Sequence, residues 1–227
     1  FRGASLPPGF EQKSETGSYR APIGSLSVNL NAERVKVMPG PEGQAPIVQV
    51  HPPNKYVKIL NEATPKTGKK VRLSVGSKPS GSTTQITIKG SIGSESKAFT
   101  TIRRIEHPVL FLGSVLREAF ALSGVRIKGR SRQCKAKATG EVVALHTSEP
   151  MSYLLGGMNK WSSNFIAEQT LRLLGTTSGA GDKKGTWEGS KRVLGACLDK
   201  MGVPQSQVRM LNGSGLYTGN QYAPKHI

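Results

Sequence analysis

The sequence lacks long hydrophobic runs and has few cysteines, aromatic residues and acidic residues. No stretch of about 18 apolar residues occurs among the 227, so the sequence predicts no membrane-spanning helix. The two cysteines, Cys134 and Cys197, form neither a CxxC motif nor a metal-ligand spacing. A disulfide between them stays open, because sequence gives no distance between the thiols. Cys197 falls on the apolar face of an expected helix, where we expect it in the core.

The histidines also follow no metal-binding spacing, so the sequence predicts no metal site and no cofactor. The four are His51, His107, His146 and His226. His146 precedes Ser162 by 16 residues, and a Ser–His pair between them can be drawn. A surface histidine is the favoured interpretation.

Acidic residues are scarce, with 14 Asp and Glu against 32 Lys and Arg, for a net charge of +18. Such a charge attracts polyanions, and nucleic acid is the usual first hypothesis. The basic residues are dispersed, however, and the one basic stripe, at 126–137, has no interleaved aromatic residue on which bases could stack. A solvated surface facing an anionic cell envelope accounts for the same charge.

The first half of the chain alternates with the period of β-strands. Short β-branched runs separated by Gly, Pro and Asn predict an antiparallel β-rich module over residues 21–105, and residues 1–20 read as an extended connector. Residues 74–84, rich in Ser, Gly and Lys, are expected to form a hairpin loop. The expected strands are 25–30, 34–38, 47–50, 56–60, 71–75 and 85–90.

Near Glu106 the hydrophobic period changes to 3.6, which predicts an α-rich second half over residues 106–227. One helix has an apolar face over 112–120 and ends at Gly124. The other expected helices are 151–158, 163–174 and one that begins near Ser190 and ends at Gly202, and 125–129 is expected to be a strand. The predicted fold class is therefore α+β.

A polar cluster, Ser162-Ser163-Asn164, opens the helix expected at 163–174. All three residue types are good N-caps, and propensity alone favours a simple helix cap. A single S-x-N triplet carries no function by itself.

The surrounding segments give the triplet a context. Residues 158–169 read M-x-K-x-S-x-N before an amphipathic helix, residues 185–190 read G-T-W-x-x-G, and residues 211–216 are close to D-G-S-G-L. Residues 107–124 and 19–29 match two further segments in the same order, and residues 43–53 match a G…P-P stretch. This ordered set, which extends from Tyr19 to Pro224, resembles the D-alanyl-D-alanine carboxypeptidase/endopeptidase family of class C penicillin-binding proteins, of the penicillin-binding protein 4 type.

The resemblance implies an α+β fold in which an inserted β-rich domain interrupts a penicillin-binding, transpeptidase-like (β-lactamase-like) domain. Residues 1–20 would be a connector and residues 21–105 the inserted domain. Residues 106–227 would be the α-rich part of the transpeptidase-like domain.

The family's chemistry needs an S-x-x-K helix with the nucleophilic serine and its lysine base, an S-x-N motif, and a K-T-G strand for the substrate carboxylate. By resemblance Ser162 would relay the proton to the leaving amine, and Asn164 would orient the substrate amide and the catalytic lysine. We expect both residues to face an exposed groove. Glu168, one turn beyond Asn164, is assigned no catalytic role.

Two literal matches to the missing motifs are rejected. Ser94-Glu95-Ser96-Lys97 matches S-x-x-K but lies among glycines between strand-like runs, where no helix would bring Ser and Lys to one face. Lys66-Thr67-Gly68 matches K-T-G but lies in a polar turn before the S-x-N triplet, the reverse of the family order. The chain thus resembles an internal fragment that carries one of three motifs. It also departs from the pattern at Ser163, Asn212 and Tyr217-Thr218.

The favoured hypothesis is a segment of a serine-type D-Ala-D-Ala carboxypeptidase that cleaves peptidoglycan peptides through an acyl-serine, in the periplasm or another extracytoplasmic compartment. Its expected partners are peptidoglycan peptides, β-lactam antibiotics and the remaining segments of the parent protein, with no nucleic acid; the chain alone would be inactive. The alternatives are a non-catalytic envelope-binding module of the same fold and, less favoured, a basic nucleic-acid-binding protein.

Overall fold

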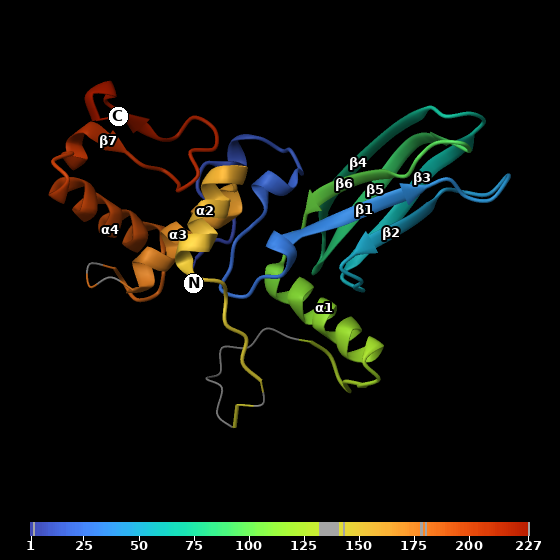
Figure 1. Cartoon of the computed structure of the whole chain (residues 1–227), viewed down its shortest axis with the longest axis horizontal. Helices are drawn as coiled ribbons and strands as arrows, with labels where there is room; N and C mark the ends of the chain where they lie inside the picture. Colours follow the sequence, from blue (N-terminus) through green and yellow to red (C-terminus); the bar gives the residue numbers. More distant parts are fainter. Residues whose placement is uncertain (2, 132–140, 143, 178, 180, 227) are drawn as a thin grey trace. The chain divides into compact units, whose positions relative to one another are not determined.

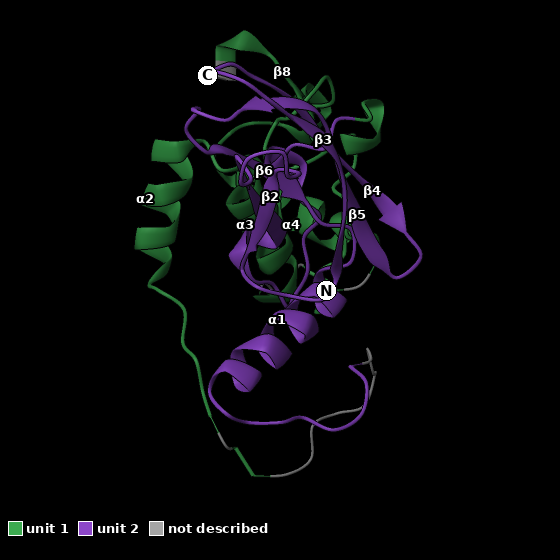
Figure 2. Cartoon of the chain, turned by 90° about the vertical axis from the view of Figure 1, so that its right-hand side faces the viewer, with its two compact units in different colours: residues 1–14, 133–227 green, residues 15–132 purple. Residues whose placement is uncertain are grey.

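The chain forms two compact units, shown in two colours in Figure 2. The computed structural model describes residues 1, 3–131, 141–142, 144–177, 179 and 181–226. The β unit is residues 15–132, and the α unit is residues 1–14 with 133–227. The helix and strand content confirms the predicted α+β class. The domain boundaries drawn at residues 20 and 105 stay a prediction.

Two three-stranded sheets make up the β unit (Figure 1). One has the order β2-β1-β6, with every pair antiparallel. The other has the order β3-β5-β4, in which β3 is parallel and β4 antiparallel to the central β5. The strands are β1 (Ala32–Met38), β2 (Ile47–His51), β3 (Val57–Lys66), β4 (Val71–Ser80), β5 (Thr83–Gly93) and β6 (Phe99–Arg104).

The core of the β unit lies between the two sheets. Successive side chains of a strand point to opposite faces, so every second residue enters the core. Val35 and Val37 of β1 and Ile86, Ile88 and Ile92 of β5 are buried in one apolar cluster. Burial of each such side chain contributes about 1.5–3 kcal/mol, which makes this cluster the main source of stability in the unit.

Helix α1 (Pro108–Leu122) belongs to the β unit. The hydroxyl of Tyr56 accepts a hydrogen bond from the His107 amide at 2.8 Å and lies 3.0 Å from the Thr84 hydroxyl. The ring of Phe111 is fully buried, with its centroid 5.7 Å from that of Tyr56. The start of α1 is therefore anchored to the strands of the β unit. The change of hydrophobic period near Glu106 marks the start of this helix and not the boundary between the two units.

The α unit contains α2 (Met151–Trp161), α3 (Asn164–Thr177) and α4 (Trp187–Lys200), with a two-stranded sheet of β7 (Val208–Arg209) and β8 (Gln221–Tyr222). Within the described residues, none of the helices is long and apolar enough to cross a membrane. Short 3₁₀ helices occupy 10–12, 18–20, 29–31, 205–207 and 224–226.

The first residues of the chain are bound to the α unit. The carbonyl of Ala4 accepts hydrogen bonds from Arg172 and from the Trp187 indole, each at 3.3 Å. The Arg172 guanidinium lies over the rings of Phe1 and Trp187, 4.9 and 4.6 Å from their centroids. Residues expected to form a loose connector thus help to hold α3 against α4.

Several local predictions were wrong for identifiable reasons. Residues 25–30 form no strand, because Asn29, Leu30 and Asn31 adopt left-handed φ angles of 50°, 54° and 51° and turn the chain. The hairpin loop expected at 74–84 shrinks to a tight turn at Gly81, since β4 and β5 pair almost to their ends. Residues 125–129 form no strand, and β6 was missed.

The helix predictions were closer. The expected helices correspond to α1 to α4, and Gly124 and Gly202 follow α1 and α4 with φ of 80° and 79°. Cys197 of α4 is exposed, so its predicted place in the core was wrong. The core side of α4 is formed by Val193 and its neighbours instead. Cys134 lies outside the described residues.

One acid is buried in the β unit. Glu33 of β1 is fully buried, and one of its oxygens accepts a hydrogen bond from the Asn54 amide at 2.6 Å. The other, Oε1, has no partner among the described residues. Burial raises the pKa of Glu33 from 4.5 to about 8, with the Asn54 hydrogen bond opposing the shift.

The stability of the chain should therefore fall as pH rises through this window. Between pH 4.5 and about 8 the folded state keeps the Glu33 proton while the unfolded state has lost it, so deprotonation favours unfolding. The slope should approach about 1.4 kcal/mol per pH unit. We expect Glu33→Gln to remove this loss in urea unfolding at pH 5 and pH 8. The exposed Glu62→Gln is the control, and an unchanged pH dependence in Glu33→Gln would contradict the assignment.

Candidate active site

The predicted S-x-N residues lie where α2 meets α3 in the α unit (Figure 1). Helix α2 ends at Trp161, and Ser162 is its C-cap in the left-handed conformation, with φ 51° and ψ 49°. The Ser163 amide donates to the Met158 carbonyl at 3.0 Å. Asn164 is the first residue of α3. The left-handed conformation of Ser162 turns the chain sharply between α2 and α3. The side chains of Ser162 and Asn164 therefore lie at the junction of the two helices.

Ser163, not Ser162, is the cap of α3. The Ser163 hydroxyl accepts from the Ile166 amide at 3.4 Å, and its carbonyl accepts from the Ala167 amide at 3.1 Å. The exposed Ser162 hydroxyl hydrogen-bonds none of the described residues. A left-handed conformation costs a non-glycine residue about 1–2 kcal/mol, and such strain is often kept at functional sites. The backbone of Ser162 is the left-handed C-cap of α2, but its hydroxyl caps neither helix.

The junction opens into a hollow of about 240 Å³. Ser162 and Asn164 line it on one side, and a turn that contains Gly213 and Ser214 lines it on the other. The remaining lining residues are Met158, Asn159, Ser163 and Ala167. Both Ser162 and Asn164 thus line one open hollow, and their role as site residues stays a prediction.

A buried carboxylate holds the second wall in place. Glu168 is fully buried on α3, and its two oxygens accept hydrogen bonds from the backbone amides of Gly213 and Ser214 at 3.0 and 2.8 Å. Burial raises the pKa of Glu168, and the hydrogen bonds from Gly213 and Ser214 oppose that shift. A Cβ at Gly213 would lie 2.9 Å from the Ala167 carbonyl oxygen, so only glycine lets the turn approach α3 this closely.

Asparagines fix the rest of the turn. The buried Asn212 donates to the Pro8 carbonyl at 2.9 Å and accepts from the Gly215 amide at 2.9 Å. Asn220 accepts from the Leu211 amide at 2.7 Å. An ionised aspartate could not donate to Pro8, which gives a physical reason for asparagine at a position where the resembled pattern has aspartate.

Comparisons with known proteins identify the family. The model of the D-Ala-D-Ala carboxypeptidase 3 (S13) family matches residues 1–227. The chain belongs to this family. A D-alanyl-D-alanine carboxypeptidase from Actinomadura sp. (strain R39) is 28% identical to this S13 chain over 218 residues, which are 92% of the chain and 40% of that relative.

Solved structures show the same fold. Penicillin-binding protein 4 (dacB) from Haemophilus influenzae matches all of this S13 chain with a TM-score of 0.78 and 17% identity, over 49% of its own length. The same protein complexed with a novel β-lactam matches 94% of the chain with a TM-score of 0.68 and 17% identity, over 48% of its length. The chain thus spans 40% to about half of the length of these relatives.

The two literal motif matches lie in neighbouring turns of the β unit. Lys66 ends β3 and leads into the turn at Thr67-Gly68, and the Ser94 amide donates to the Lys66 carbonyl at 2.8 Å. Ser94 stands in a turn after β5 and not at the start of a helix. The helical spacing that would bring the Ser94 hydroxyl and the Lys97 amine to one face is therefore not provided.

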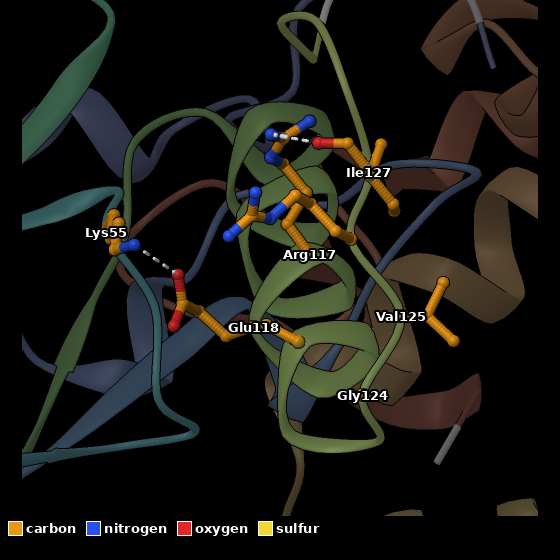
Figure 3. Close-up of a pocket in the computed structure, with 8 residues that line it drawn as sticks. Lys55, Arg117, Glu118, Gly124, Val125 and Ile127 are labelled. Atoms are coloured by element: carbon orange, nitrogen blue, oxygen red, sulfur yellow. Dashed lines mark hydrogen bonds and ion pairs between the residues drawn. The ribbon is translucent and has the colours of Figure 1, made fainter.

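A second hollow, of about 380 Å³, lies beside α1 (Figure 3). Lys55 forms an ion pair with Glu118 there at 3.2 Å, and Arg117 donates to the Ile127 carbonyl at 2.9 Å. Arg117 thereby holds the chain that follows α1, and the hollow is lined by residues of the 107–124 segment and by Arg126 of the basic stripe. Among the residues that the structure describes, no three His, Cys, Asp or Glu side chains gather in a way that could hold a metal ion.

Sequence reasoning singled out Ser162 and Asn164 as candidate site residues but missed what holds the opposite wall of the hollow. The notable residues are Glu168 and Ser214, 46 positions apart. The available signal was an acid on the apolar side of α3, at a spacing of four from Asn164, together with a Gly-Ser-Gly turn whose amides needed acceptors. Only the structure joins these two features.

Replacement of Glu168 by glutamine should loosen this wall. Glutamine offers one acceptor oxygen, and its amide nitrogen would face a backbone N–H, so one buried donor loses its partner. We expect Glu168→Gln to lower the free energy of unfolding by about 1–3 kcal/mol in urea titration. The matched control, Glu188→Gln, changes an exposed acid of α4 and should stay within about 0.5 kcal/mol. Equal stability of the two variants would show that the Glu168 bonds do not hold the turn.

Proposed function

We propose that this chain supplies the S-x-N wall of the active site of a serine-type D-Ala-D-Ala carboxypeptidase, which cleaves peptidoglycan peptides through an acyl-serine. The observation that carries the proposal is the hollow at the α2–α3 junction. Ser162 presents an unengaged hydroxyl there while the adjacent Ser163 caps the helix. Membership of the S13 family and the carboxypeptidase relative support the same reaction class.

The chemistry requires a proton to be moved twice. When the nucleophilic serine attacks the peptide carbonyl, its proton passes to a neighbouring base, and the leaving D-alanine amine must then receive a proton. In this proposal the Ser162 hydroxyl passes that proton on, donating one and accepting another. Asn164 offers both an amide donor and a carbonyl acceptor, so it can hold a substrate amide and the catalytic lysine in one orientation.

The serine and lysine of S-x-x-K and the K-T-G strand would come from the rest of the longer protein, with no cofactor. Part of α2 is suited to meet such segments, since it has no buried residue and Tyr153 and Trp161 are 69% and 76% exposed. A large exposed apolar patch often marks an interface. We propose that the remaining segments of the parent protein cover it.

The proposed function also implies the binding partners of the protein and its cellular location. A relative of this fold has been solved with a β-lactam, which supports acylation of the parent protein by penicillins. Peptidoglycan peptides as substrate imply a location outside the cytoplasm, in the periplasm or cell envelope. Such a location brings the chain's net charge of +18 close to anionic envelope polymers.

Two neighbouring serines allow the catalytic and structural roles to be separated. In the full-length protein, Ser162→Ala should slow acylation by penicillin by a factor of about ten to a thousand, the range for loss of one proton-transfer group. Its melting temperature should change little, because the hydroxyl of Ser162 hydrogen-bonds no described residue and only its backbone forms the C-cap of α2. Ser163→Ala should do the reverse, costing about 1 kcal/mol of stability while acylation continues. Normal acylation in Ser162→Ala would refute the relay.

The isolated 227-residue chain should not be labelled covalently by a fluorescent penicillin. Its one S-x-x-K match, at Ser94, stands in a turn without the helix that would activate the serine. Gel fluorescence and peptide mapping after long incubation would check this, with the full-length protein as the positive control. Label mapped to Ser94 would mean that the two turns of the β unit form a nucleophilic site.

A further inference from the structure

The sheet β3-β5-β4 buries one face and exposes the other. The buried face carries Ile86, Ile88 and Ile92. The opposite residues of the three strands, in register, form what we call the outer sheet face. Its members are Lys58, Leu60, Glu62 and Thr64 of β3, Gln85, Thr87, Lys89 and Ser91 of β5, and Arg72, Ser74, Gly76 and Lys78 of β4.

Positive charge dominates the outer sheet face. Lys58 and Lys78 flank Gln85 in one row, and Arg72 pairs with Ser91 three rows further along. All three basic side chains are exposed, and none forms an ion pair with a described residue. The one acid, Glu62, binds Lys89 at 3.1 Å and neutralises it. Two further exposed lysines, Lys66 and Lys70, stand where β3 ends and just before β4 begins.

The spacing of these charges suits an extended chain. Strands lie about 4.8 Å apart, so the backbones of Lys58 and Lys78 are about 10 Å from each other, and six residues along β5 span about 20 Å. At physiological salt the screening length is about 8 Å, so Lys58 and Lys78 lie little more than one screening length apart, and Arg72 lies about 2.5 screening lengths from Lys78. The hydroxyls of Thr87 and Ser91 on the central strand lie on the same face and can donate to phosphate oxygens.

From this arrangement we propose that the outer sheet face binds a linear phosphodiester polymer of the cell envelope. The outer sheet face has no aromatic residue among its members, so it offers no platform on which the bases of a nucleic acid could stack. A polymer that presents only phosphates and hydroxyls needs no such platform. The choice of a polymer of the cell envelope rests on the proposed function. The charge and geometry of the outer sheet face are observed independently of that proposal.

Binding of a synthetic poly(glycerol phosphate) of about ten repeats to the full-length protein tests the proposal. The triple variant Lys58→Gln, Arg72→Gln, Lys78→Gln should bind at least about tenfold more weakly at 0.1 M salt and show a shallower salt dependence. The control removes the same charge from exposed positions of the α unit, Lys184→Gln, Arg192→Gln, Lys200→Gln, and should lose less than about twofold.

Glu62→Gln tests the same surface in the opposite direction. It frees Lys89 from its ion pair and should tighten binding, whereas Glu188→Gln in the α unit should not. Because it is a single substitution, Glu62→Gln still tests the outer sheet face if the triple variant does not fold. Acylation by penicillin should be normal in every variant, which separates a failure here from a failure of the proposed active site.

Three outcomes would overturn the proposal. Equal weakening by the two triple variants would mean that net charge alone drives binding. Unchanged affinity in Glu62→Gln would remove the outer sheet face from the interaction. Single-stranded DNA of equal charge that binds this face more tightly than the glycerol polymer would make it a nucleic-acid surface.

Discussion

The turn at residues 211–216 lies against α3 because one buried carboxylate, that of Glu168, accepts hydrogen bonds from two consecutive backbone amides. The hollow between Ser162, Asn164 and Ser214 exists only while that turn stays in place. A buried acid is costly unless its lone pairs are satisfied, and here the backbone satisfies them. Gly213 completes the arrangement, since any side chain would collide with α3.

Two neighbouring serines that look equivalent in the sequence have different roles in the structure. Ser163 takes the capping duty, which leaves Ser162 in a left-handed conformation with its hydroxyl directed to no described partner. The chain thus maintains a strained, exposed hydroxyl beside an amide side chain at the end of a rigid helix. Rigid placement of such groups is what a proton-transfer step needs, because misalignment of about 1 Å can cost a hundredfold in rate.

Local pattern predicted the helices and most strands because each has one buried face, as α1 and β5 do. It failed where backbone conformation departs from the residue type's preference, as at Leu30 with its left-handed φ of 54°. By resemblance to a family it singled out Ser162 and Asn164, of which Asn164 begins α3 and Ser162 is the C-cap of α2. It could not find the Glu168–Ser214 contact or the outer sheet face, because both depend on residues brought together across tens of positions.

The account's central claim is that Ser162 and Asn164 touch the reacting group. The most direct measurement is a crystal structure of the full-length protein acylated by a penicillin. The account predicts that the Ser162 hydroxyl and the Asn164 amide lie within about 3.2 Å of atoms of the acyl adduct or of the groups that hydrogen-bond it. An adduct bound elsewhere, with both side chains more than about 6 Å away and facing solvent, would contradict the account.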